Sequence, residues 1–135
     1  MVLLIDANII LDVLMNRQPF VKDSSLIWKL CETEKAKGYV STLAFANMMY
    51  IMRKEMSAEM IEEVFGKLKL IFEFVDFSPA ILEKAVEMKW NDFEDAVQSA
   101  TAEQIRADYI VTRNIRDFTK SKVMAFTPFE LLVRI

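Results

Sequence analysis

The sequence predicts a single α/β domain in three layers, with a central parallel sheet of four to five strands flanked by helices. Short apolar segments of strand type alternate with amphipathic segments of helix type along all 135 residues. No linker, repeat or low-complexity stretch interrupts this alternation. The length suits one compact domain with a substantial core, so we expect one domain over residues 1–135.

Five segments have the composition of buried strands. The first, residues 2–5, is the uninterrupted apolar run VLLI, which is typical of a strand buried on both faces. The other predicted strands are residues 39–41, 71–77, 109–112 and 123–126. Strands that alternate with helices form parallel sheets, because each crossover helix returns the chain to the same edge of the sheet.

Amphipathic segments of helical period separate these strands. Apolar residues continue after the first strand in residues 7–15, and an apolar stripe predicts a helix over residues 26–37. The clearest start is Ser78 followed by Pro79, because serine caps helices and proline favours the first helical position. Residues expected to precede or cap the other helices are Ser24 and Ser25, Thr42, Ser57, Asn91 or Asp92, and Thr127.

Several classes of function are excluded by what the chain lacks. Without a histidine, the protein cannot be a triad hydrolase or a histidine-based ribonuclease. Its only glycines, Gly38 and Gly66, cannot form a P-loop or a dinucleotide fingerprint. The single cysteine, Cys31, rules out a disulfide framework. The net charge of −3 argues against nucleic-acid binding through bulk positive charge.

We expect a cytoplasmic protein that does not cross a membrane. The first residues, MVLLIDANIILD, lack the charged start and long apolar core of a signal peptide. No uninterrupted apolar stretch approaches the length that spans a bilayer. The single cysteine fits a reducing compartment.

Acidic side chains follow two of the predicted strands, close to the point where each strand ends. Asp6 comes directly after the first strand, and Asp117 follows the strand at residues 109–112. The carboxyl ends of parallel strands meet at one edge of a sheet, and binding sites form there. We therefore expect Asp6 and Asp117 to lie near one another.

A third group of acids lies in the segment NDFED, residues 91–95, just before a helical segment. Helical spacing places Asp92, Asp95 and Ser99 on one face. It turns the apolar residues towards the core, namely Phe93, Ala96, Val97 and Ala100. Helix capping and the helix dipole explain Asp92 and Glu94 on their own. They do not explain why acids also follow two strands. Asp6, Asp95 and Asp117 together therefore favour a functional site.

Converging acids without histidine point to a site for Mg²⁺ or Mn²⁺, which prefer hard oxygen ligands. Close carboxylates repel one another unless a cation offsets their charge. Such a cation can lower the pKa of a bound water and neutralise charge on a phosphodiester under attack. The acids therefore predict phosphate chemistry on a protein that is acidic overall.

Three segments in order carry a family resemblance: LLIDANIILDVL at the start, STLAFANMMYIMRK in the middle, and DFEDAVQSATAEQIRADYIVTRNIRDF near the end. Through them the chain resembles the PIN-domain (PilT N-terminus) family over essentially its full length. That family comprises metal-dependent ribonucleases and includes the VapC-type toxins of bacterial toxin–antitoxin pairs. The resemblance implies a PIN-like fold and a site that uses Mg²⁺ or Mn²⁺ to cleave RNA.

The resemblance also implies which residues act. Asp6, Asp95 and Asp117 take the positions of the catalytic, metal-binding acids, and Asn114 stands where some relatives carry the last acid. Asn47 stands where the family usually has a glutamate. An amide brings no charge, so metal affinity is expected to be weaker unless Asp92 or Glu94 compensates.

The remaining candidates support this site. Thr112 is expected to hydrogen-bond a phosphate or a metal-bound water, unless it only satisfies the backbone. Asn8 either orients Asp6 or caps the next helix. A basic cluster beside the acids suits RNA phosphates, and solvated surface charge is its simpler explanation. This cluster comprises Arg113, Arg116, Lys120 and Lys122.

The expected function is that of a Mg²⁺- or Mn²⁺-dependent endoribonuclease, the toxin of a type II toxin–antitoxin pair, with a protein antitoxin as partner and a homodimer as assembly. The alternative is a weakened or inactive PIN-like module that binds RNA or protein. A dehalogenase-like phosphotransfer domain fits poorly, because the chain has Asp6-Ala7-Asn8 in place of Asp-x-Asp. Clustered methionines fit either a partner surface or ordinary core filling. They are Met48, Met49, Met52, Met56 and Met60.

Overall fold

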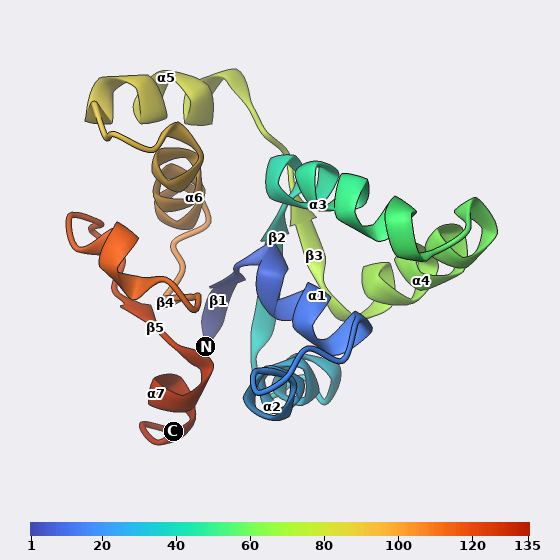
Figure 1. The fold of residues 1–135 in the computed structure, drawn as a ribbon. Helices are drawn as coiled ribbons and strands as arrows, with labels where there is room; N and C mark the ends of the chain where they lie inside the picture. Colours follow the sequence, from blue (N-terminus) through green and yellow to red (C-terminus); the bar gives the residue numbers. More distant parts are fainter.

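The computed structural model describes residues 1–135 and contains a five-stranded, fully parallel sheet with helices on both faces (Figure 1). The strands follow the order β3-β2-β1-β4-β5 across the sheet. Their bounds are β1 (Val2–Ile5), β2 (Lys37–Ser41), β3 (Glu73–Val75), β4 (Tyr109–Val111) and β5 (Ala125–Phe126). The predicted α/β class and the predicted number of strands are confirmed.

The helices divide between the two faces of the sheet. Figure 1 shows α1 to α4 grouped on one side and α5 with α6 on the other. None of the helices is both long and apolar enough to cross a bilayer. The helix bounds are α1 (Ala7–Leu14), α2 (Val21–Glu32), α3 (Thr42–Glu55), α4 (Ala58–Ile71), α5 (Pro79–Met88), α6 (Phe93–Gln104) and α7 (Pro128–Leu132), with a 3-10 helix η1 (Ile115–Phe118).

Strand β1 is buried on both faces, as its apolar run predicts. Leu3 and Ile5 join the larger core beneath α1 to α4, whereas Leu4 packs into a separate cluster on the opposite face. This alternation follows from the two-residue period of a strand. Core filling explains Met48 and Met52, which are buried in the larger core. It does not explain Met60, which is 51% exposed.

Helix α2 begins earlier than its sequence predicts. It starts at Val21, so Ser24 lies inside the helix instead of preceding it. The Ser24 hydroxyl is buried and donates a hydrogen bond to the Asp12 carboxylate of α1, with 3.1 Å between the oxygens. A serine whose hydroxyl has a partner on another helix does not compete for its own backbone, and the helix continues through it.

The predicted cap of α3 was also wrong. Ser41 caps this helix through its side chain, while the Thr42 hydroxyl donates to the Val75 carbonyl at 2.8 Å. Strands β3 and β5 are shorter than the predicted segments. Residues 71–77 do not form one strand, because α4 continues through Ile71.

The order of the strands places a topological switch next to β1. From β1 the chain runs outwards to β2 and β3, then crosses to the other side of β1 to form β4. At such a point the connections leave the sheet in opposite directions and open a crevice beyond the carboxyl ends of the strands. Asp6 directly follows β1, and Thr112 directly follows β4.

Candidate active site

Asp6 is held in place by three hydrogen bonds at the end of β1. Its backbone N–H continues the sheet by donating to the Val111 carbonyl at 2.9 Å. One carboxylate oxygen accepts from the Asn8 backbone N–H at 3.1 Å, and the other accepts from the Thr112 hydroxyl at 2.8 Å. Asp6 itself is the N-cap of α1, so the interpretation of Asn8 as the cap was wrong.

Thr112 joins the two sides of the topological switch. Its side chain is fully buried, donates to Asp6 and accepts from the Asn114 backbone N–H at 3.1 Å. The same hydroxyl therefore fixes Asp6 and the start of the loop that leads to η1. Asn114, in this loop, and Asp117, in η1, are exposed.

The acids before α6 have two distinct tasks. Asp92 is the N-cap of α6, and its carboxylate accepts from the Asp95 backbone N–H at 3.0 Å. Asp95, in the first turn, is partly buried at the border of the core. Burial of the helix face formed by Ala96, Val97 and Ala100 is confirmed, but Phe93 does not join it, being 44% exposed.

Burial and neighbouring charge act on Asp95 in the same direction. Burial, as the larger cause, and the negative charges of Asp92, Asp117, Asp6 and Glu94 together raise the pKa of its carboxyl from 3.8 to about 6. No lysine or arginine is among the groups that act on it. Acids from the ends of β1 and β4 and from the start of α6 therefore lie within electrostatic reach of one another.

These acids line two separate cavities. A cavity of about 230 Å³ is lined by Asp92, Asp95 and Asp117, with Lys89 and Lys120 at its wall. A second cavity, of about 130 Å³, is lined by residues of α1, α3 and α6, among them Asp6, Asn8, Asn47, Ile51 and Glu94. Asp92 and Glu94, two residues apart in the chain, thus belong to different cavities.

The donor set has the chemistry of a Mg²⁺ or Mn²⁺ site. All its groups are oxygen donors, and part of the rise in the pKa of Asp95, after the larger effect of burial, comes from repulsion that a cation would relieve. In the present side-chain positions, no three acidic side chains stand close enough to hold one metal ion. The acids fit a divalent cation by type, and coordination by three of them would require their side chains to move closer together.

The basic residues after β4 differ in solvent exposure and in whether they have partners within the protein. Arg116 and Lys120 are exposed, and so is the nearby Lys122. Arg113 is held inside the protein instead: its guanidinium lies 3.2 Å from the Asp12 carboxylate, and its central carbon lies 3.9 Å from the centre of the Phe20 ring.

The sequence reasoning did not find Asp12. This residue of α1 is fully buried, accepts a hydrogen bond from Ser24 and lies near Arg17 (3.8 Å) as well as Arg113. Burial raises the pKa of the Asp12 carboxyl, and the hydroxyl and two guanidinium groups oppose the rise. An acid flanked by the apolar residues IIL and VL in the helix ANIILDVL is the signal that could have identified it.

The fold is similar to several solved structures at low sequence identity, one of which is a toxin–antitoxin complex. FitAcB from Neisseria gonorrhoeae aligns with a TM-score of 0.72 and 18% identity over 96% of this chain and 99% of its own. VapBC2 from Rickettsia felis, bound to a promoter DNA fragment, aligns with a TM-score of 0.68 and 17% identity over 94% and 98%. A toxin–antitoxin complex from Klebsiella pneumoniae aligns with a TM-score of 0.67 and 22% identity over 93% and 96%.

No curated protein sequence matches the chain. The family model described as PIN domain matches residues 2–116, which include every acid that lines the two cavities except Asp117. The matched segment contains all of the sheet except β5, together with α1 to α6. By this match and by its fold, the chain belongs to the PIN-domain family.

Proposed function

We propose that the protein is a metal-dependent endoribonuclease that acts in the cytoplasm as the toxin of a type II toxin–antitoxin pair. PIN domains are generally nucleases. The observation that carries the proposal is Asp95, a partly buried carboxyl whose pKa is raised to about 6 by burial and by the charges of four other acids. Such a cluster is costly without a divalent cation, and a cation held there suits phosphodiester hydrolysis.

Asp6, Asp95 and Asp117 would hold the metal ion, Mg²⁺ or Mn²⁺. When bound, the ion lowers the pKa of water and offsets negative charge on the phosphodiester. The protein's own contribution is positional. Thr112 and the Asn8 backbone N–H fix both oxygens of the Asp6 carboxylate. The Asn114 backbone N–H donates to the Thr112 hydroxyl and so helps to hold it in place. Some relatives carry an acid at the position of Asn114. The exposed Arg116 and Lys120 can bind the flanking RNA phosphates.

Purified protein should cleave RNA in Mg²⁺ or Mn²⁺, and excess EDTA should stop the reaction. Cleavage that continues at full rate in EDTA would contradict the proposal, because the acids alone provide no means of offsetting phosphate charge. Failure to cleave any RNA while metal still binds would favour the alternative, a PIN-like module that binds RNA or protein. Asn47, an uncharged residue in the second cavity, is the observation that favours this alternative.

We further propose that Glu94, and not Asp92, compensates for Asn47. Glu94 shares a cavity with Asn47 and Asp6, whereas Asp92 lines the other cavity and caps α6. Glu94→Gln should weaken Mn²⁺ binding about ten-fold. Adding Asn47→Glu to that variant should restore binding, because the charge returns to the same cavity.

The measurement for this swap is calorimetric titration of Mn²⁺ into each variant. Asp92→Asn is the matched control, since asparagine caps helices as well as aspartate, and it should change the affinity less than Glu94→Gln. If Asp92→Asn has the larger effect, or if the double variant does not recover Mn²⁺ binding, Glu94 does not compensate for Asn47.

The antitoxin and the homodimer need apolar surface, and the protein has two such regions. An apolar cavity of about 320 Å³ between α3 and α4 is lined by Phe45, Met49, Phe65 and Phe74. We propose that an antitoxin helix fills it, by the helix-in-groove mode of recognition. On α5, Leu82 and Val86 are 43% and 58% exposed and lie one turn apart, which suits a self-complementary dimer contact.

A further inference from the structure

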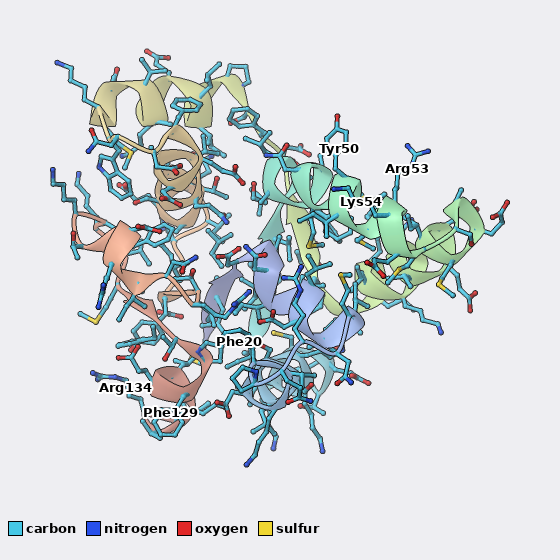
Figure 2. The ribbon with its side chains drawn as sticks, viewed as in Figure 1. Phe20, Tyr50, Arg53, Lys54, Phe129 and Arg134 are labelled. Carbon is cyan, nitrogen blue, oxygen red and sulfur yellow. The ribbon has the colours of Figure 1, made fainter.

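A cavity of about 320 Å³ lies where α2 meets α7, with Arg113 in its lining. Its lining includes Pro19, Phe20, Asp23, Arg113, Pro128 and Phe129. Figure 2 shows Phe20 and Phe129 in this part of the molecule, away from the outer side of α3 that carries Tyr50 and Arg53. We infer that this cavity is a slot for one guanine base of the RNA substrate. The inference rests on the proposed function and names part of its substrate.

The slot offers aromatic surface to a flat ligand. Phe20 is 40% exposed and Phe129 is 61% exposed, although both are large apolar side chains. Bases stack on exposed aromatic rings in proteins that bind single-stranded nucleic acid, and every base provides a face for stacking. The volume is within the range of sites for small organic molecules. These features suit a nucleobase, and they do not choose among the four.

Two polar groups in the slot make the choice. The Nε–H of Arg113 is buried and has no hydrogen-bond partner, because the ion pair with Asp12 uses a terminal nitrogen. Asp23 lies in the first turn of α2 and enters no ion pair. The slot therefore presents one carboxylate without an ion-pair partner, which repels a phosphate, and a residue of its wall holds a buried donor without a partner.

Guanine is the base that complements this pair. Its N1–H and N2–H₂ groups are neighbouring donors that a single carboxylate can accept, and its O6 and N7 atoms accept from an arginine. Adenine, cytosine and uracil each lack either the two neighbouring donors or the two neighbouring acceptors. Asp23 would accept from the guanine N1–H and N2–H₂ groups while Phe129 stacks on the base. The buried Arg113 Nε–H would donate to the base once the guanidinium turns away from the Phe20 ring.

The slot and the two acid-lined cavities share no lining residue, but one step along the chain connects them. Arg113 directly follows Thr112, whose hydroxyl is bonded to Asp6, so the two side chains leave neighbouring Cα atoms about 3.8 Å apart. Arg113 contributes to the wall of the slot, while Thr112 contributes to the site. A guanine in the slot would place an adjacent phosphate of the same strand beside the acids.

The test uses the whole protein in EDTA, so that it does not depend on metal or cleavage. GMP, AMP, CMP and UMP are titrated separately, with two-dimensional NMR reporting on Phe129 and Asp23. We expect GMP to bind at least about ten-fold more tightly than the other three. Phe129→Ala should weaken all four about ten-fold, whereas Asp23→Asn should remove the preference for GMP. Phe77→Ala, an exposed phenylalanine outside the slot, is the matched control and should change nothing.

Equal binding of all four nucleotides, or shifts that leave Phe129 and Asp23 unaffected, would overturn the slot. So would a protein antitoxin that covers Phe129 when no nucleotide does. The nuclease proposal is tested separately by cleavage in Mn²⁺. GMP binding without any RNA cleavage would support the guanine slot and contradict the nuclease proposal. Cleavage without a preference for guanine that persists in Phe129→Ala would support the nuclease proposal and contradict the slot.

Discussion

Replacing Asp95 with asparagine should abolish RNA cleavage and at the same time stabilise the metal-free protein at neutral pH. The rate of cleavage should fall about 100-fold or more, the size expected when a group that acts in the transition state is removed. Asparagine keeps the shape of the side chain and cannot carry the negative charge. The loss of activity would then come from the charge and not from unfolding.

The gain in stability follows from the pKa of Asp95, which is raised from 3.8 to about 6 in the folded protein. A raised carboxyl pKa means that the folded state binds the proton more tightly than the unfolded state does, so ionisation of Asp95 opposes folding. Its contribution to stability is fully present below pH 3.8 and is lost as the pH rises through about 6. At pH 7.5 the variant should therefore be more stable by about 1–2 kcal/mol, allowing for solvent screening of a partly exposed group.

Urea unfolding in EDTA at pH 7.5 and at pH 3.5 measures this difference. The two proteins should differ at the higher pH and agree at the lower, where both side chains are neutral. Asp76→Asn is the control, because Asp76 is an exposed acid near the end of β3 that does not act on Asp95. A variant that is less stable than the parent at pH 7.5 would show that Asp95 is a structural acid, and full cleavage by Asp95→Asn would remove it from the catalytic set.

Replacing Asp12 with alanine should destabilise the protein by about 3–5 kcal/mol, the cost of breaking a buried ion pair by removing one partner. Asp12 is fully buried, and the change leaves the Arg113 guanidinium and the Ser24 hydroxyl without their acceptor. Arg113 directly follows Thr112, which holds the Asp6 carboxylate. Cleavage should therefore also fall in molecules that remain folded. The protein would then lose the contact that ties the loop after β4 to α1.

Urea unfolding at pH 7.5 provides the measurement, and a double variant separates the ion pair from simple loss of packing. Asp12→Ala combined with Arg113→Met should be less destabilised than the sum of the two single variants, because neither charge is then left alone. Additive losses would mean that the pair contributes through packing only. A cost below about 1 kcal/mol for Asp12→Ala would show that water reaches Arg113 and replaces the carboxylate.

The sequence by itself determined the architecture and the position of the acids along it. Short apolar runs and amphipathic stretches with period 3.6 are local properties, and they were enough to find the five strands and most helices, though not every boundary. The caps Ser57, Ser78, Asp92 and Thr127 were correct because a cap bonds to backbone groups only three residues away. The position of Asp6 at the end of β1 needed nothing more than the end of an apolar run.

Only the tertiary structure decided which side chains are engaged with which. The bond from Thr112 to Asp6 joins residues 106 positions apart, and the partner of Arg113 proved to be Asp12, on a helix at the other end of the chain. The same contacts explain why Ser24 lies inside α2. Asp92 and Glu94 line different cavities because α6 presents successive side chains in different directions. The physical reason is general: burial and partners in space set the charge and role of a side chain, and local pattern does not contain them.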